Sequence, residues 1–360
     1  LRSGRWAAAA EGGGSPAGGS EVWTWTRTPP SLKPPSVHCE AGAILATYSK
    51  YCKKRTGKDK DLFKKAVRLF LFVDDASAKA DMERTVSQAL AKLALPRELL
   101  ASQESLEELK AVGLKGQQYF IIPTLFHLVA DLQRQKREFA VLFRSFGKDH
   151  EKVKGEWNAF CELRHPVFSR LIQDVGPLDG SVPSLPDRRV HDLHTLYRDS
   201  EGPVLILDTF TNGPEDKTWD SWAKAKPKPE ADTRGGRVYI KEVLNAKTIE
   251  GLDALQQWMR SHMSSQATSA IKDDWAWWQF HGERAHAGKL LPLIGGPETT
   301  RQIFFDDNID LDDPRIVDCR DPFGEAVPAD VALREGICIK VNPVEALLSE
   351  DYFLQKLEGP

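Results

Sequence analysis

The sequence has no long hydrophobic run, and no stretch approaches the roughly 18 apolar residues that a membrane-spanning helix needs. It has only five cysteines, scattered without a close pair, so we expect neither a disulfide framework nor a zinc site. It also lacks an excess of charge of one sign, because the formal net charge is −3. We therefore expect no membrane, no nucleic-acid partner and a reducing compartment.

The length and composition favour one large globular domain. With 360 residues, 41% of them hydrophobic and 28% charged, the chain can bury a substantial core. The first part differs, because it begins rich in Gly, Ser, Pro and Ala and ends in a basic stretch. Such a composition cannot bury enough apolar surface to order itself. We predict a disordered tail over 1–60 and a folded domain over 61–360.

Two features of this tail leave alternatives open. The basic residues gathered between Lys50 and Arg68 could touch phosphate or RNA, but a solvated helix or linker is the favoured interpretation. The chain begins at Leu1, and its first residues are rich in Arg and Ala. This start is compatible with an organelle transit peptide, whereas the cytoplasm is the default expectation.

The most informative stretch is Ile303–Phe305 followed by Asp306 and Asp307. Three bulky apolar residues without polar alternation indicate a strand buried on both faces, as in a parallel sheet. Ligands of such sheets bind at the carboxyl ends of the strands, where paired carboxylates suit a hard cation such as Mg²⁺. An ordinary loop is the alternative, since Asp and Asn are common in turns.

Apolar runs and helical patterns alternate along the rest of the chain. The predicted strands are 67–73, 139–143, 204–207, 238–240, 316–318 and 337–341. The predicted helices are 79–118, one from Pro123, one from Asp149, about 247–263, one opened by 273–278 with Asp273 as its cap, and 343–357. This alternation predicts an α/β fold with a doubly wound, mainly parallel, Rossmann-like sheet. Its additions are a small helical cap over about 79–118 and an irregular insertion over about 174–237.

Four polar signals follow or precede these apolar runs, and their order resembles the haloacid dehalogenase-like (HAD-like) superfamily of phosphotransferases and phosphohydrolases. The signals are Asp74 with Asp75, Ser145, Lys289, and Asp306 with Asp307. Within the superfamily the chain looks like a group of algal and protist proteins from about residue 65 to its end. The hallmarks of that group are Phe-Arg-Ser-Phe-Gly-Lys-Asp at 143–149, Trp-Asn-Ala-Phe-Cys at 157–161, Asp-Asp-Trp-Ala-Trp-Trp at 273–278, and 303–309.

The resemblance implies a Mg²⁺-dependent hydrolase that acts on a small phosphorylated molecule. Asp74 would be the nucleophile, and its carboxylate would form an aspartyl-phosphate. Mg²⁺ would be held by Asp74, by the backbone carbonyl of Ala76, and by Asp306 or Asp307.

Three further residues would act on the phosphoryl group according to the same resemblance. Ser145 would hydrogen-bond a phosphate oxygen, helped by amide groups at the start of its helix. Arg144 would also contact the substrate, and Lys289 would stabilise the nucleophile and the developing negative charge. Taken singly, Ser145 is better explained as a plain helix N-cap and Lys289 as a solvated surface lysine.

One segment departs from the family pattern. The superfamily motif is Asp-x-Asp-x-Thr or Val, whereas 74–78 reads Asp-Asp-Ala-Ser-Ala. Ala76 therefore replaces the acid that protonates the leaving group, and losing a general acid typically costs about 10² to 10⁴ in rate. A shifted alignment would make Asp75 the nucleophile and put Ser77 at the acid position.

The sequence thus leaves two hypotheses. The first is a phosphatase-like hydrolase with weakened activity. The second is a catalytically inactive relative that binds a phosphorylated ligand or a protein partner. Either hypothesis predicts that Asp74, Ser145, Lys289 and the two acids converge at the carboxyl ends of parallel strands.

The aromatic and histidine residues elsewhere are given structural roles. Trp275 and Trp278 are three residues apart and share a helix face, which predicts packing on the sheet rather than a substrate wall. His191 and His194 are predicted to be surface residues rather than metal ligands, because no third ligand lies nearby in the sequence.

Overall fold

The computed structural model describes residues 76–114, 116, 118–211, 235–295, 300–310 and 314–358, together with the backbone of three strands nearer the N-terminus. The chain divides into two compact units, residues 1–87 and 88–360. The predicted strand 67–73 and the acids Asp74 and Asp75 lie outside the described residues.

In the first unit, a three-stranded antiparallel sheet has the order β2-β1-β3. Its strands are β1 (Gly4–Ala10), β2 (Trp23–Thr26) and β3 (Ala43–Thr47). These strands lie within the predicted tail over 1–60, most of which is outside the described residues, so its disorder stays a prediction.

The segment predicted as one helical region over 79–118 contains three helices. They are α3 (Ala76–Leu93), which crosses the boundary between the two units, the 3₁₀ turn η1 (Arg97–Leu100) and α4 (Gln103–Ala111). Ser102 begins α4 by accepting a hydrogen bond from Ser105 N at 3.1 Å. Gly113 follows α4 with a φ of +86°, a conformation that glycine adopts without strain.

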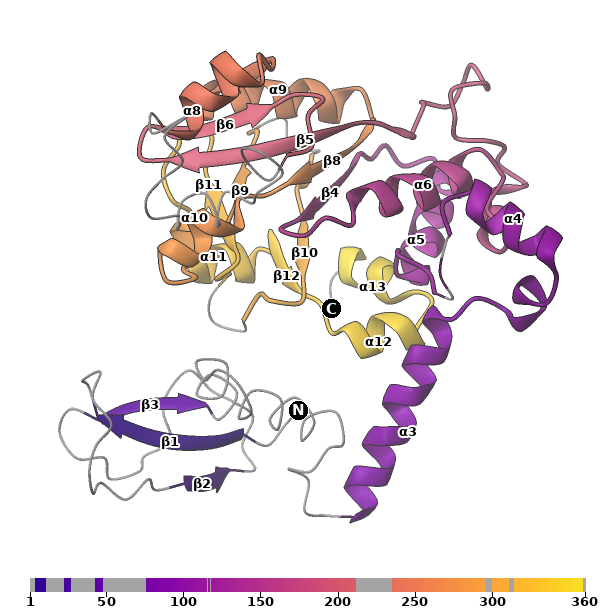
Figure 1. Ribbon diagram of the computed structural model, residues 1–360, viewed down its shortest axis with the longest axis horizontal. Helices are drawn as coiled ribbons and strands as arrows, with labels where there is room; N and C mark the ends of the chain where they lie inside the picture. Colours follow the sequence, from indigo (N-terminus) through magenta and orange to yellow (C-terminus); the bar gives the residue numbers. More distant parts are fainter. Residues whose placement is uncertain are drawn as a thin grey trace. The chain divides into compact units, whose positions relative to one another are not determined.

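The second unit is a mixed α/β domain in which most strand pairings are parallel. Its largest sheet has the order β4-β8-β5-β6-β7 (Figure 1), with β4 at Val141–Ser145, β8 at Thr268–Lys272, β5 at Val190–Asp199, β6 at Gly202–Ile206 and β7 at Thr248–Glu250. The β4–β8 and β8–β5 pairings are parallel, whereas β5–β6 and β6–β7 are antiparallel.

Two further parallel pairs complete the strands of this unit. One joins β9 (Lys289–Pro292) to β11 (Val317–Arg320), and the other joins β10 (Phe304–Asp306) to β12 (Cys338–Lys340). The predicted strands at 316–318 and 337–341 are therefore confirmed to within one or two residues. In β10 the register pairs Asp306 with Lys340.

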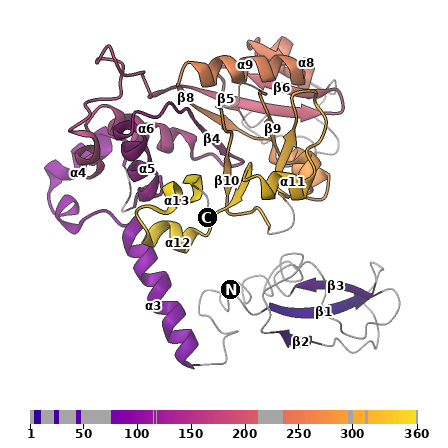
Figure 2. The same cartoon turned by 180° about the vertical axis from the view of Figure 1, so that it is seen from behind.

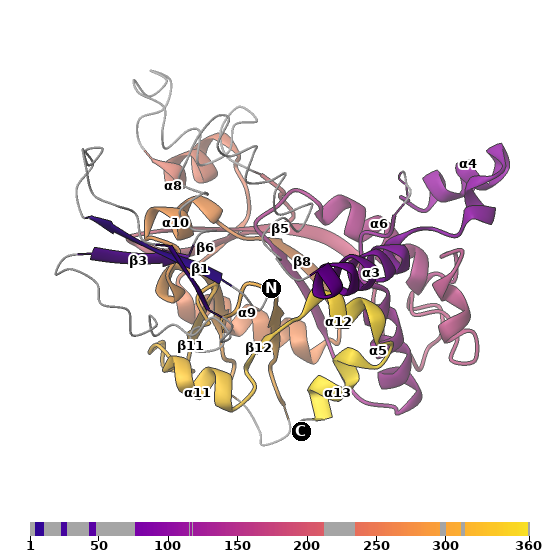
Figure 3. The ribbon, with the colours of Figure 1, turned by 90° about the horizontal axis from the view of Figure 1, so that it is seen from below.

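Helices cover both faces of the main sheet. On β8, Ala270 packs in the core beneath α6 (His150–Cys161), and its neighbour Ile271 packs in the core beneath α9 (Leu252–Ser264). Adjacent residues of a strand point to opposite faces, so α6 and α9 lie on opposite sides, as Figure 3 shows.

The remaining helices pack around these elements. They are α5 (Pro123–Arg134), η2 (Phe168–Ile172), α8 (Gly236–Val238), α10 (Trp275–Phe280), η5 (Ala285–Ala287), α11 (Ala329–Arg334), α12 (Pro343–Leu348) and α13 (Tyr352–Glu358). The C-terminal helices α12 and α13 lie beside α5 (Figure 2). No helix in the described ranges is both long enough and apolar enough to cross a membrane.

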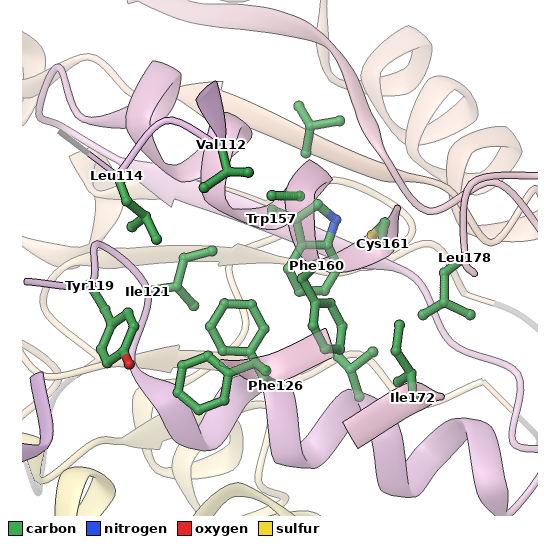
Figure 4. Packing of buried hydrophobic residues seen from close by; sticks show 14 of the residues in the cluster. Val112, Leu114, Tyr119, Ile121, Phe126, Trp157, Phe160, Cys161, Ile172 and Leu178 are labelled. Carbon is green, nitrogen blue, oxygen red and sulfur yellow. The ribbon is translucent and has the colours of Figure 1, made fainter. Parts of the chain in front are cut away.

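The largest core lies between α4, α5 and α6 (Figure 4). Phe126 is at its centre, and the centroid of its ring lies 4.8 Å from that of Phe160 and 4.7 Å from that of Phe168. Trp157 and Cys161 on α6 are also fully buried. Full burial of such a large aromatic side chain contributes on the order of 2–3 kcal/mol, so this face fixes α6 on the sheet.

Two central strands were not predicted. β5 lies within the predicted irregular insertion, and β8 was assigned to no element, although both occupy the middle of the sheet. The sequence of β5 begins Val-His-Asp-Leu-His-Thr, so its polar residues hide the apolar pattern. His194 is consequently buried, with 5% of its surface exposed, and its prediction as a surface residue is wrong, whereas His191 is exposed as predicted.

Three other elements differ from prediction. The strand predicted over 238–240 is a helical turn, in which α8 leads into a π-helical segment, η4 (Tyr239–Val243). The helix predicted from about 247 begins at Leu252, because the preceding residues pair with β6 as β7. The closing helix is broken into α12 and α13 where Ser349 takes an extended conformation.

Arg188 is a buried cation that has no carboxylate partner among the described residues. Its Nη1 donates to the carbonyls of Phe139 and Gln266, at 2.6 and 3.0 Å, and its Nη2 donates to the side-chain oxygens of Gln133 and Gln266 at 3.1 Å. Burial lowers the pKa of Arg188 to about 10, so the guanidinium is still charged at neutral pH. This single side chain joins α5, the start of β4 and the loop before β8.

We expect Arg188→Met to lower the free energy of unfolding by about 3–5 kcal/mol, because it leaves several buried acceptors unpaired. Arg189→Met is the matched control, because Arg189 pairs with Asp187 and Glu162 at the surface. That change should cost less than about 1 kcal/mol. Urea unfolding measures both, and equal losses would contradict the assigned role of Arg188.

A partly buried cluster holds two histidines, His194 and His262, around the indole of Trp258. The ring centroids of His194 and His262 lie 5.4 Å and 5.2 Å from that of Trp258. The backbone N–H of Asp208 donates to Nδ1 of His194 at 3.0 Å, which requires an unprotonated nitrogen. Burial lowers the pKa of both imidazoles, and that of His262 falls to about 4.

These lowered pKa values predict a loss of stability in acid. The unfolded chain protonates its histidines near their ordinary pKa of 6.5, before folded His262 does, so stability is fully present above pH 6.5 and is lost as pH falls towards 4. In His262→Phe, which keeps a ring on Trp258, the fall in Tm between about pH 7 and about pH 4.5 should be smaller than in the wild type. The control His286→Phe, at an exposed histidine, should leave the slope unchanged. A wild-type slope in His262→Phe would contradict the expectation.

Candidate functional site

A cavity of about 550 Å³ opens where β4 and β10 end and β9 begins. Its polar wall consists of Arg144, Ser145, Lys289, Asp306, Asp307 and Asn308. Its apolar wall includes Ile122 at the start of α5, Pro343 at the start of α12, and Phe353 on α13. The structure therefore brings together the predicted site residues on β4, β9 and β10, although they are far apart in the sequence.

Ser145 is the last residue of β4, and two hydrogen bonds fix its position. Its Oγ accepts from Gly147 N at 2.9 Å, and its carbonyl accepts from Asp273 N at 2.8 Å. A hydroxyl oxygen that accepts one bond can still donate its proton, so the side chain is suited to a ligand oxygen. Ser145 does not cap α6, which begins at His150.

Asp306 ends β10 and is held by two donors. Its Oδ2 accepts from Lys289 Nζ at 2.7 Å, and each of these side chains is only 7% exposed. Its Oδ1 accepts from the backbone N of Asn308 at 2.8 Å and from the amide of that side chain at 3.3 Å. The carboxylate is therefore oriented by a counter-charge and a turn.

Asp307 lies next to this pair but in a different environment. Its side chain is exposed, and its Oδ1 accepts from Asn308 Nδ2 at 3.1 Å. Lys340 on β12 donates to the carbonyl of Asp307 at 3.2 Å and to the carbonyl of Ile309. This lysine braces the loop after β10, and Asn308 Nδ2 donates to the carboxylates of both adjacent acids.

Lys289 reaches the cavity from an unexpected end of its strand. It is the first residue of β9 instead of following a strand, so the expectation of a carboxyl-terminal position is wrong for this residue. Its long side chain carries the ammonium to Asp306, and Nζ also lies 3.4 Å from the carbonyl of Arg144. The rings of Phe146 and Phe304 lie 5.3 and 5.8 Å from Nζ and shield it from water.

Arg144 lines the cavity, but its guanidinium is engaged elsewhere. Nε donates to Asp273 Oδ2 at 2.9 Å, Nη2 pairs with Asp273 Oδ1, and Nη1 donates to the carbonyl of Leu290 at 3.1 Å. The prediction that Asp273 caps α10 is wrong, because the N-cap is Asp274, whose side chain accepts the hydrogen bond from Trp277 N. Substrate contact by Arg144 stays a prediction, and its visible partners are protein groups.

The tryptophans of α10 pack against the β9–β12 region, as predicted. Trp278 belongs to the core formed with Leu291 and Phe304, and its ring stacks on Phe146 at 5.3 Å. Its Nε1 donates to the carbonyl of Arg315 at 3.0 Å. No residue of α10 lines the cavity, so the aromatic face supports the site from behind.

The first motif cannot be placed against this cavity. Asp74, the predicted nucleophile, lies outside the described residues, and Ala76 is the first residue of α3. None of the described residues of 79–118 lines the cavity, and Leu109 and Leu114 instead pack in the core with α5 and α6. A covering role for that segment stays a prediction.

The oxygen donors fit a hard cation but do not by themselves complete a site. Asp306, Asp307 and Asn308 present carboxylate and amide oxygens, which Mg²⁺ prefers. Within the ranges that the structure describes, no three His, Cys, Asp or Glu side chains are grouped to hold a metal ion. Further ligands would have to come from elsewhere, such as the predicted Asp74 or water.

Sequence reasoning gave no site role to three residues that shape the cavity: Asn308, Lys340 and Asp273. Asn308 ends the Asp-Asp-Asn triplet and Asp273 begins the motif 273–278, so both stand in segments that the sequence singled out. Lys340 carries no such signal, because its role depends on the pairing of β12 with β10.

The buried pair predicts unequal effects of neighbouring substitutions. Lys289→Met should lower the free energy of unfolding by about 3–5 kcal/mol, because Asp306 then stays buried without a counter-charge. Asp307→Asn, at the exposed acid, should change it by less than about 1 kcal/mol. Urea denaturation measures the free energy of unfolding of both variants. A loss below about 1 kcal/mol for Lys289→Met would argue against a buried Lys289–Asp306 ion pair.

Comparison of the chain with protein-family models, with curated proteins and with solved structures finds no match. The resemblance to the HAD-like superfamily therefore rests on the sequence motifs. Support for a function comes from those motifs and from the geometry of this cavity.

Proposed function

We propose that the protein is a HAD-like, Mg²⁺-dependent phosphatase-like hydrolase that acts on a small phosphorylated substrate through an aspartyl nucleophile. The observation that carries the proposal is the meeting of Ser145, Lys289, Asp306 and Asp307 around one cavity. These residues are far apart in the sequence, and unrelated loop residues would have no reason to meet.

The architecture supports the same proposal at a finer level. A doubly wound, Rossmann-like sheet requires parallel strands with helices on both faces. The β4–β8–β5 segment and the β10–β12 pair are parallel, and α6 and α9 cover opposite faces of the main sheet. Ser145 and Asp306 both end their strands, which is where such folds bind ligands.

The proposed roles follow from the chemistry of each side chain. The hydroxyl of Ser145 donates to a phosphate oxygen, and Lys289 offsets negative charge near the reacting phosphorus. Asp306 and Asp307, with Asp74, hold Mg²⁺, which when bound draws the phosphate in and lowers its repulsion of a carboxylate nucleophile. Asp74 takes the nucleophilic role from the resemblance alone.

A second candidate, binding without turnover, is favoured by one specific observation. Ala76 stands where the superfamily has its general acid, and no alanine can donate a proton. The cavity keeps Ser145 and Lys289, the residues proposed to contact phosphate, regardless of that replacement. Under this alternative the protein recognises a phosphorylated ligand and does not hydrolyse it.

The first experiment is a binding measurement on the full chain. Mg²⁺ should raise Tm in proportion to the logarithm of its excess over the dissociation constant, because it binds the folded state. In Asp306→Asn this increase should disappear. A Ca²⁺-free buffer in which Na⁺ replaces Mg²⁺ at equal ionic strength controls for the screening of charges by salt. Absence of any Mg²⁺ effect in the wild type would remove the main support of both candidates.

The second experiment separates the two candidates. Screened against a panel of phosphate monoesters, the wild type should release phosphate slowly, and only with Mg²⁺ present. Release should stop in Asp74→Asn and increase by about 10²-fold or more in Ala76→Asp, which restores the acid. If Mg²⁺ stabilises the protein but no ester turns over even in Ala76→Asp, the binding protein is the correct candidate.

A further inference from the structure

The most deeply buried ion pair beside the cavity joins Arg144 to Asp273. The side chain of Arg144 is 4% exposed and that of Asp273 is 1% exposed. Contact is bidentate, since Nε donates to Oδ2 at 2.9 Å while Nη2 pairs with Oδ1. Bidentate guanidinium–carboxylate contacts fix geometry more strictly than single hydrogen bonds do.

Backbone groups connect this pair to Ser145 and Lys289, the two residues proposed to contact phosphate. The backbone N of Asp273 donates to the carbonyl of Ser145 at 2.8 Å. On the other side, Nη1 of Arg144 donates to the carbonyl of Leu290 at 3.1 Å, and the carbonyl of Arg144 lies 3.4 Å from Nζ of Lys289. The pair therefore links the ends of β4 and β8 to the start of β9.

The guanidinium of Arg144 uses three of its five N–H groups on protein oxygens, and these contacts fix its orientation. Nε, Nη1 and Nη2 each donate to a protein oxygen, and the planar group is turned towards Asp273. Breaking these bonds to reach a ligand would leave the carboxylate of Asp273 buried without its counter-charge, which is strongly unfavourable. Arg144 is thus held in place by the protein itself.

We propose that Arg144 and Asp273 are positioning residues, which set the distance between the hydroxyl of Ser145 and the ammonium of Lys289 and do not touch the ligand. The inference rests on the proposed function, because it assumes that the cavity binds phosphate. It reassigns Arg144 from substrate contact to alignment and adds Asp273 to the site. Groups that orient ligand-binding residues in this way typically matter by 10- to 100-fold.

The test uses the full chain, with inorganic phosphate in excess Mg²⁺ as the probe and calorimetry as the readout. Asp273→Asn keeps the shape of the side chain but removes its charge, and should weaken phosphate binding by about tenfold or more. The matched control is Asp199→Asn, because Asp199 makes a bidentate pair with Arg237, at 2.8 and 2.9 Å, and lines no part of the cavity. Phosphate affinity should be unchanged in that control.

A second variant separates alignment from stability. Arg144→Met combined with Asp273→Leu removes both charges together, and replacing a buried ion pair by apolar groups is often neutral for folding. This double variant should keep its Tm yet still lose about tenfold in phosphate affinity. Adding Ser145→Ala to it should cost less than Ser145→Ala costs in the wild type, because coupled sites are not additive.

Each outcome decides the inference. Unchanged phosphate affinity in a folded Asp273→Asn, or in the double variant, overturns the positioning role and leaves the proposed function intact. Failure of the double variant to fold also overturns it, because the pair would then be needed for stability. A wild type that binds no phosphate in the presence of Mg²⁺ overturns the proposed function together with the inference.

Discussion

The cavity depends on the ion pair between Lys289 and Asp306. It joins β9, from one parallel strand pair, to β10, from the other, and almost no water reaches it. Removing a charge from water costs several kcal/mol, and only a close counter-charge offsets that cost. The ion pair therefore favours the placement of β9 relative to β10 that brings Nζ to Oδ2, and the polar wall of the cavity depends on that placement.

Around this pair, polar and apolar elements have divided roles. Strand ends supply the polar groups, and the helices α5, α12 and α13 supply the apolar wall. Thr124 on α5 donates to the carbonyl of Ala346 on α12 at 2.7 Å, and Phe353 meets Phe305 edge to face with centroids 5.2 Å apart. Helix packing thus holds one wall against the other, independently of the charges that organise the strands.

Sequence reasoning identified the polar wall better than it identified the sheet. Ser145, Lys289 and Asp306 stand beside apolar runs, and such a local pattern needs no knowledge of topology. β5 and β8 were missed because polar residues, among them His194 and Lys272, interrupt the apolar pattern of strands that are nevertheless buried in the sheet. Arg188 could not be foreseen either, since its carbonyl partners become close only after folding. Asp74 stays a prediction, because it lies outside the described residues.

If the proposed function is correct, the mutual neutralisation of Lys289 and Asp306 would make the binding of phosphate and the binding of Mg²⁺ depend on each other. Together they contribute no net charge to the polar wall, and the guanidinium of Arg144 is likewise balanced by Asp273. A lone phosphate would then meet little attraction, and a lone divalent cation would meet chiefly the carboxylate of Asp307. Each ion supplies the charge that the other lacks, so the two would bind cooperatively, and thermodynamic linkage requires each to raise the affinity for the other by the same factor.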